Sequence, residues 1–184
     1  LFPQLLSTLD EIEGDFWLRI LYTYPSRLTN ELLKTIKASR HICHYLDIPL
    51  QHVEPKILKA MGRKVESENY LELIKRIRSI LPDVAIRSTF ILGYPGETEE
   101  DFQKVLDFLL EARLDWVGAF PYYREEGTAA AKLKPQVHHS TRKRRAKEVL
   151  ITQQSISLEK NRSLEGRALK VLLERKSPSE PGLW

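Results

Sequence analysis

The chain has 184 residues, 42% of them hydrophobic and 29% charged, which is enough apolar material for a globular core and too much for a disordered chain. No apolar run approaches the roughly 20 residues that a bilayer span needs, which excludes a membrane protein. The single cysteine, Cys43, excludes an internal disulfide and a multi-cysteine metal site within this chain, and we expect a cytoplasmic protein.

The net charge of +4 is unevenly distributed along the chain. Residues 132–147 contain seven Lys or Arg, two His and no carboxylate. Such a basic run is typical of a surface that contacts an anionic partner, and it is equally typical of a solvated helix face. Both interpretations stay open at this point.

The hydrophobic pattern predicts alternating helices and strands. In chain order these are a helix at 5–12, a strand at 16–24, a helix at 29–36, a strand at 45–50, helices at 54–61 and 67–80, a strand at 84–92, a helix at 98–113, a strand at 115–122 and a long polar helix at 140–162. Four such alternations predict an α/β fold with parallel strands and outer helices. Residues 168–174 predict one further strand of a module that we expect to be incomplete.

Two of the predicted helices begin with capping signals. Thr29 and Thr98 are residue types that helix N-caps prefer. Three acids at 99–101 follow Thr98, which is typical of a capping box and suits the positive end of the helix dipole.

Each predicted strand runs into a proline at its carboxyl end, in the strings YTYPS, DIPLQH, LGYPGET and AFPYY. Proline cannot donate a hydrogen bond to a sheet, so each proline marks where pairing stops and a loop begins. The carboxyl ends of parallel strands form the ligand face of α/β folds, so we expect polar side chains there to converge on one rim. They are Tyr24, Gln51, His52, Arg87, Ser88, Thr89, Glu97, Tyr122 and Tyr123.

Each of these candidates has a purely structural alternative. Gly93 and Gly96 either let a backbone approach a ligand or form a tight turn before a helix. His52 either contacts a ligand or is a hydrogen-bonded buried group. Arg87 lies in an apolar strand, and its guanidinium must be paired or bind a ligand, because unpaired burial is costly.

The large aromatic residues of the predicted strands are most simply assigned to the core: Trp17, Phe90, Trp116 and Phe120. Cys43 has no neighbouring cysteine and is expected to be an inert buried thiol.

Three strings carry a resemblance to a known family. YLDIPLQHVEPKILKAMGR at 45–63, RSTFILGYPGETEEDF at 87–102 and EEGTAAA at 125–131 resemble the methylthiotransferases of the radical S-adenosylmethionine (SAM) superfamily, and the resemblance covers about residues 1–175. PLQH and EEGT resemble the RimO type, which modifies an aspartate of ribosomal protein S-twelve. The transfer-RNA-modifying relatives typically have Gln-Ser-Gly in place of Gln51-His52-Val53 and REGT in place of EEGT.

The resemblance implies a partial radical-SAM (β/α) barrel, namely its C-terminal half, in residues 1–138. Residues 139–165 would be a connecting helix. Residues 166–184 would begin a TRAM-like β module, a small barrel that docks RNA or protein partners.

The resemblance also implies cofactors: SAM and, in the intact family, two 4Fe-4S clusters, one held by a CxxxCxxC loop and one by cysteines of an N-terminal domain. One cysteine cannot replace three, so no metal ligand and no catalytic residue is assigned within this chain. We expect a fragment that is inactive alone. In the intact protein a cluster would reduce SAM, the resulting radical would take hydrogen from the substrate's β-carbon, and the second cluster would supply the methylthio group.

By the same resemblance, the retained residues form a cofactor cradle. Gln51 and His52 would lie beside the methionine part or the substrate, residues 87–89 at the inner end of the third strand, residues 93–97 near the adenosyl part, and Tyr122 with Tyr123 on the far side. The cofactor-binding residues predicted in this way are Gln51, His52, Arg87, Ser88, Thr89, Gly93, Pro95, Gly96, Glu97 and Tyr122.

The sequence therefore leads to a RimO-type enzyme that acts on ribosomal protein S-twelve, with a transfer-RNA adenosine methylthiotransferase as the alternative within the family. A second class of function is a ribosome- or RNA-binding module without catalysis, which would use residues 132–147 and the TRAM-like end. A lyase or aldolase that uses Arg87 and His52 on an anionic substrate is the weakest alternative.

Overall fold

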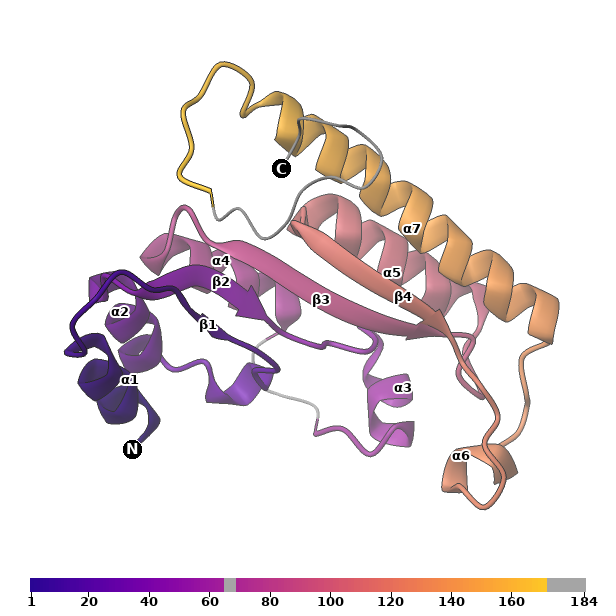
Figure 1. Ribbon diagram of the computed structural model, residues 1–184. Coiled ribbons are helices and arrows are strands. Elements are labelled where there is room, and N and C mark those ends of the chain that lie inside the picture. The colour runs from indigo at the N-terminus through magenta and orange to yellow at the C-terminus, as the bar shows by residue number, and fades with distance from the viewer. Residues whose placement is uncertain (65–68, 172–184) are drawn as a thin grey trace, which may run out of the picture.

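The computed structural model of the chain describes residues 1–64 and 69–171. Its centre is a parallel sheet with the strand order β1-β2-β3-β4 (Figure 1). The strands are β1 (Leu18–Ile20), β2 (Ile42–Asp47), β3 (Ala85–Leu92) and β4 (Trp116–Pro121). The predicted α/β fold with parallel strands is therefore confirmed.

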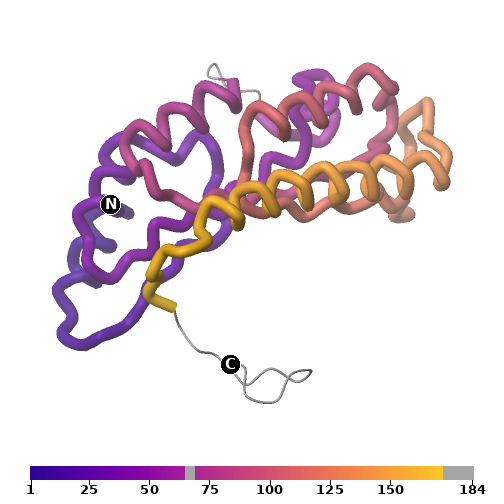
Figure 2. Tube along the Cα trace, turned by 90° about the horizontal axis from the view of Figure 1, so that it is seen from above, coloured from indigo at the N-terminus to yellow at the C-terminus, as the bar shows by residue number. Residues whose placement is uncertain are grey.

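Helices fill the connections between the strands, as parallel pairing requires. The helical elements of the described residues are, in chain order, α1 (Phe2–Asp10), the 3-10 turn η1 (Pro25–Arg27), α2 (Asn30–Ala38), α3 (Pro55–Ala60), α4 (Tyr70–Ile80), α5 (Glu99–Ala112), α6 (Ala129–Lys132) and α7 (His139–Arg162). Of these, α1 precedes β1, and α6 and α7 follow β4. Figure 2 shows α4 and α5 on one side of the sheet and the long α7 running along the molecule, where it packs against β4 and α5. Among the described helices, none combines the length and apolar character that a membrane span requires.

The core lies between the helices and one face of the sheet. On β3, Ile86, Phe90 and Leu92 are buried, whereas Arg87 and Thr89 are only partly buried. This alternation follows from the two-residue period of a strand, which sends neighbouring side chains to opposite faces. The second face of the sheet, which carries Arg87, Thr89 and Trp116, is the more exposed one, and we call it the open face; near its carboxyl end Ile91 packs against the cluster of Ile57, Tyr94 and Tyr122.

Both predicted helix caps are confirmed. The Thr29 hydroxyl accepts a hydrogen bond from the Leu32 amide at 3.2 Å. The Thr98 hydroxyl accepts one from the Asp101 amide at 3.2 Å, and the Asp101 carboxylate accepts one from the Thr98 amide at 2.8 Å. This reciprocal capping box fixes where α5 begins, directly after the loop that follows β3.

Three expectations need correction. β1 is much shorter than the predicted strand at 16–24, because its pairing with β2 shifts register between Leu18 and Ile20 and the backbone turns at Tyr22 with φ +57°. Residues 168–171 form no strand, and the rest of the strand predicted there lies outside the described residues, as does most of the 166–184 module.

The third correction concerns the aromatic residues. Phe90 is fully buried as predicted, but Trp17, Trp116 and Phe120 are 41%, 72% and 55% exposed. Trp116 pairs with Arg87 and Phe120 with Ile91 across the β3–β4 ladder, so the two aromatic side chains of β4 lie on the open face. An apolar residue in a parallel strand belongs to the core only if a layer covers its face.

Candidate functional site

The carboxyl ends of the four strands meet at one edge of the sheet, because all three strand pairs are parallel. Three of the four prolines identified in the sequence, Pro25, Pro49 and Pro95, follow the ends of β1, β2 and β3, and Pro121 is the last residue of β4. In open α/β sheets this edge is where ligands bind. The predicted common rim is therefore present, and its side chains differ in how far they are available to a ligand.

Arg87 and Thr89 lie on the open face. The Arg87 guanidinium, 37% exposed, pairs with the Asp47 carboxylate at 2.9 Å, and the Asp47 side chain is only 1% exposed. Arg87 is thus paired within the chain, while its exposed part stays accessible. A Cβ built on Gly118 would lie 3.2 Å from the Phe120 ring and, at an ordinary van der Waals distance, 3.6 Å from the Thr89 hydroxyl.

Ser88 lies on the other face of β3. It is fully buried, and its hydroxyl accepts a hydrogen bond from the Leu50 amide at 3.3 Å. The prediction grouped Ser88 with Arg87 and Thr89, but strand alternation separates it from them. In this structure Ser88 ties the segment after β2 to β3 and does not face the open side.

Gln51 is the most unusual residue of the rim. Its φ of +71° lies in the left-handed region, which a side chain with a Cβ rarely adopts. Its backbone bonds β3 on both sides: the Gln51 amide donates to the Thr89 carbonyl at 2.7 Å, and the Ile91 amide donates to the Gln51 carbonyl at 2.9 Å. Its side-chain Oε1 is buried without a hydrogen-bond partner among the described residues.

An irregularity in pairing explains this position. Asp47 pairs with Arg87 and Gln51 with Phe90, so the segment after β2 advances four residues while β3 advances three. The extra residue is a local bulge, a feature that re-aims side chains near ligand sites. Strain together with an unsatisfied acceptor marks Gln51 as the best candidate for a ligand contact.

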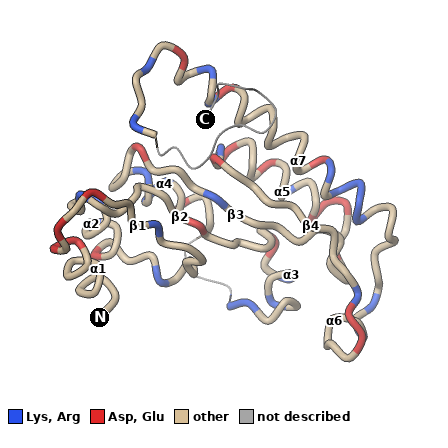
Figure 3. Tube along the Cα trace, viewed as in Figure 1, with Lys and Arg blue, Asp and Glu red and all other residues tan. Residues whose placement is uncertain are grey.

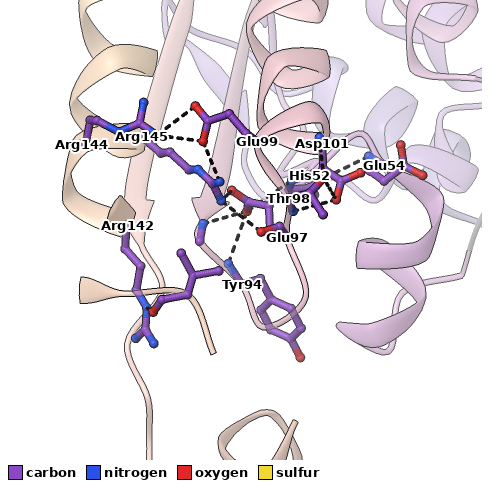
Figure 4. Close-up of polar contacts among 12 residues, drawn as sticks. His52, Glu54, Tyr94, Glu97, Thr98, Glu99, Asp101, Arg142, Arg144 and Arg145 are labelled. Carbon is purple, nitrogen blue, oxygen red and sulfur yellow. Dashed lines mark hydrogen bonds and ion pairs between the residues drawn. The ribbon is translucent and has the colours of Figure 1, made fainter. Parts of the chain in front are cut away.

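Glu97 is the centre of a buried polar cluster, which Figure 4 shows in close-up. One carboxylate oxygen pairs with the Arg145 guanidinium at 2.7 Å, and their side chains are 0% and 5% exposed. The other oxygen accepts the amides of Gly93 at 2.7 Å and Tyr94 at 3.3 Å. Both oxygens are thus occupied by the chain itself, and Glu97 organises the loop from which we expected it to contact the cofactor.

His52 belongs to the same cluster and is fully buried. Its Nδ1 accepts a hydrogen bond from the Glu54 amide at 2.9 Å, so Nε2 carries the proton. Nε2 faces a Glu97 oxygen at 3.4 Å, which is an electrostatic contact longer than a good hydrogen bond. His52 therefore links the loop after β2 to the loop after β3, in line with the structural alternative considered for it.

The two glycines of the loop at 93–96 were expected to let the backbone approach a ligand, and only one of them has open space around it. A Cβ on Gly93, whose φ is +73°, would lie 2.4 Å from Cγ of Arg142, so the space above this glycine is filled by α7 and not open to a ligand. Gly96, with φ +86°, has open space around it, and its amide donates to the Pro135 carbonyl. Pro95 is buried.

Tyr122 packs in a small apolar cluster at the same edge. Its ring meets Tyr94 edge-on at 5.1 Å, and the Arg142 guanidinium lies 5.0 Å above it. The Tyr122 hydroxyl is buried without a hydrogen-bond partner among the described residues, whereas Tyr123 is 79% exposed. Burial, with a smaller contribution from Tyr122, raises the pKa of Tyr94 above its ordinary value.

The sequence did not single out three residues of this region, namely Asp47, Arg142 and Arg145. The two arginines lie in the basic run, yet both are buried. Figure 3 shows basic residues at the start of α7 near acidic ones at the start of α5. A usable signal existed, because Arg142, Arg145, Ala146 and Val149 recur at helical spacing on one buried side of α7.

The cofactors differ in how well they fit these residues. A 4Fe-4S cluster does not fit, because it needs several thiolates and the chain has one cysteine. Within the described ranges no group of three His, Cys, Asp or Glu could hold a metal ion. SAM does fit the rim, where Gln51 offers a buried acceptor that is unpaired among the described residues and the partly buried Thr89 offers a hydroxyl.

Comparison with known proteins agrees with this geometry. Residues 2–109, more than half of the chain, match the family model described as the radical SAM superfamily. The chain belongs to the radical SAM superfamily. Among solved structures, coproporphyrinogen III oxidase (HemN) from Escherichia coli, described as a radical SAM enzyme, superposes with a TM-score of 0.66 at 18% identity, over 84% of this chain and 36% of HemN. That likeness concerns the fold and confirms a partial radical SAM fold.

Curated relatives show which subgroup of the superfamily this chain is similar to. The chain is 45% identical, over 96% of its length, to the ribosomal protein uS12 methylthiotransferase RimO of Carboxydothermus hydrogenoformans, and 47% identical, over 93%, to that of Thermodesulfovibrio yellowstonii. The predicted similarity to RimO-type proteins is thus confirmed. The chain spans about 40% of the length of these relatives.

Proposed function

We propose that this chain supplies the SAM-binding rim of a RimO-type methylthiotransferase that modifies an aspartate of ribosomal protein uS12 in the cytoplasm. The observation that carries the proposal is Gln51: a strained residue at the carboxyl edge whose buried Oε1 has no partner in the described residues. Leaving a buried acceptor unsatisfied costs free energy, and a ligand that donates to it removes that cost.

The remaining rim residues have complementary roles. Thr89 and the exposed part of Arg87 line the open face, while Ser88, His52 and Glu97 hold the surrounding loops through their contacts within the chain. Gly93, Pro95 and Gly96 shape the loop after β3, and Tyr122 closes the edge from β4. SAM bound there supplies hydrogen-abstracting chemistry, and the chain's own part is to bind and orient it.

The ligands of the iron–sulfur clusters are not among the residues of this chain. In the intact family two 4Fe-4S clusters take part, and neither finds its ligands in this chain. A cysteine-bearing segment must accompany this one in a working enzyme.

The curated relatives are named as uS12 methylthiotransferases, and the substrate proposed for this protein is the same. We also propose that the protein contacts the ribosome or RNA when it binds this substrate. The cations left for such contact are the exposed Lys132, Lys134, Lys143 and Lys147, because Arg142, Arg144 and Arg145 bind groups of the chain itself. Affinity that falls steeply with added salt would support this contact, and salt-insensitive binding would contradict it.

An assay of the intact protein tests the function. The protein, expressed from its full gene and reconstituted anaerobically with iron and sulfide, is incubated with SAM, a reductant and either uS12 or transfer RNA. We expect a methylthio group on a uS12 aspartate, detected by mass spectrometry, and loss of that product in Gln51→Ala. Modification of transfer RNA alone would favour the alternative subgroup, and product formation without SAM would overturn the proposal.

A further inference from the structure

The ion pair between Arg145 and Glu97 connects two parts of the chain that are 48 residues apart. Glu97 ends the loop after β3, and Arg145 lies in the second turn of α7. Both side chains are at least nine-tenths buried and 2.7 Å apart. A buried carboxylate needs such a partner, because taking either charge away leaves the other uncompensated.

The same carboxylate determines the course of the rim loop. Its second oxygen holds the amides of Gly93 and Tyr94, in a turn where Gly93 and Gly96 both have positive φ. It also faces Nε2 of His52, whose own loop contains Gln51. Movement of the Glu97 carboxylate would therefore disturb both loops that border the predicted cofactor site.

Arg144 offers an internal comparison. It lies next to Arg145 on α7, but its side chain is 45% exposed, and it pairs at the surface with Glu148 and with Glu99, a carboxylate that it shares with Arg145. Such pairs contribute little to stability and do not touch the rim loop. Of these two neighbouring arginines, only Arg145 reaches the residues that shape the site.

We propose that Arg145 is a positioning residue for SAM binding: through Glu97 it holds the 93–97 loop, and the His52 loop beside it, in the shape that receives the cofactor. The inference rests on the proposed function for its ligand and on the structure for its geometry. On this proposal Arg145, although it belongs to the basic run at 132–147, supports the cofactor site and does not contact an external partner.

Two measurements on the intact protein test the proposal, with Arg145→Met as the variant and Arg144→Met as the matched control. Equilibrium dialysis gives the dissociation constant for SAM and, separately, the number of binding sites per protein. Partial unfolding alone lowers the number of sites and leaves the dissociation constant unchanged. Hydrogen exchange gives the protection of residues 93–97, with α4 as the internal reference.

We expect Arg145→Met to weaken SAM binding at least tenfold and to speed exchange at 93–97, with α4 unchanged and Arg144→Met within twofold of wild type in both. Wild-type affinity and wild-type exchange in Arg145→Met would overturn the proposal. If Arg145→Met does not fold, Arg145→Gln is measured instead: it removes the charge that pairs with Glu97 and keeps a polar side chain, so weaker SAM binding with faster exchange at 93–97 supports the proposal, and wild-type values of both contradict it. If the wild-type protein binds no SAM, the proposed function fails, whereas the exchange data still decide whether Arg145 orders the loop.

Discussion

At the scale of single residues, Gln51 combines backbone strain with an unsatisfied side chain, and the two can be separated by mutation. The left-handed region costs a residue with a Cβ about 1–2 kcal/mol, and glycine avoids that cost while gaining freedom in the unfolded chain. We expect Gln51→Gly to raise the free energy of unfolding by about 0.5 kcal/mol.

Gln51→Ala is the matched variant, because it removes the amide and keeps the Cβ. We expect both variants to lose SAM affinity at least tenfold, with the glycine variant more stable than the alanine variant. Chemical denaturation and equilibrium dialysis check this pair. Equal stability of the two variants would show that the backbone at Gln51 is not strained.

Asp101, in the capping box of α5, is expected to make the free energy of unfolding depend on pH. Burial alone would raise its pKa, but hydrogen bonds from Lys56 and Thr98 outweigh burial and lower the pKa below its ordinary value of 3.8. A carboxyl group whose pKa is lower in the folded than in the unfolded state stabilises the fold when it is ionised. That contribution is present above the unfolded-state pKa and is lost as the pH falls through the folded-state pKa. We expect Asp101→Asn to be less stable than wild type near neutral pH and to lose less stability on acidification below about pH 4. Parallel curves of unfolding free energy against pH for the two proteins would refute this.

The residue scale also shows where sequence reasoning succeeds and fails. The caps at Thr29 and Thr98 depend on neighbours within one helical turn, so local sequence predicts them. Ser88 departs from the predicted group because side chains alternate along β3, which puts it on the buried face, opposite Arg87 and Thr89. Asp47 was not identified because its partner Arg87 is 40 residues away, a distance that no local pattern spans.

At the scale of elements, the contact between α7 and the end of β3 predicts different costs for two neighbouring glycines. In Gly93→Ala the new methyl group meets the stem of Arg142 and the backbone is strained, so we expect a loss of about 3 kcal/mol in unfolding free energy. In Gly96→Ala the methyl group meets open space, and only strain of about 1 kcal/mol applies. Thermal or urea unfolding measures both, and equal losses would mean that α7 does not cover Gly93.

The elements themselves were largely predictable. Each strand and helix expected between residues 5 and 162 has a counterpart, because hydrophobic periodicity and capping residues are local signals. The role of α7 was not predictable in the same way. Its charged composition suggested a solvated or nucleic-acid-binding helix, yet Arg142 and Arg145 are buried, because carbonyl and carboxylate acceptors from distant loops surround them.

At the scale of the whole molecule, the cysteine content sets what this chain does by itself. A 4Fe-4S cluster needs several thiolates, and Cys43 is the chain's only cysteine. We expect the 184-residue chain, treated anaerobically with iron and sulfide, to bind no stoichiometric cluster. Iron analysis and visible absorption check this result. A stable cluster on this chain would mean that its ligands are not those of the family.

The exposure of the open face of the sheet also depends on the whole molecule. Trp116 and Phe120 look like core residues in the sequence, and whether they are buried depends on what covers the sheet, which no local pattern encodes. Arg87 and Thr89 of β3 lie on this face, and we assign it to the cofactor together with Gln51, which pairs with β3 at Phe90.

The central claim is that SAM binds at the carboxyl edge of this sheet, against Gln51. A crystal structure of the intact protein with SAM tests it most directly. We expect the cofactor at that edge, over the open face, with a donor group within hydrogen-bond distance of the Gln51 side-chain oxygen. SAM bound elsewhere, or a Gln51 oxygen satisfied by another protein group with SAM out of reach, would contradict the claim.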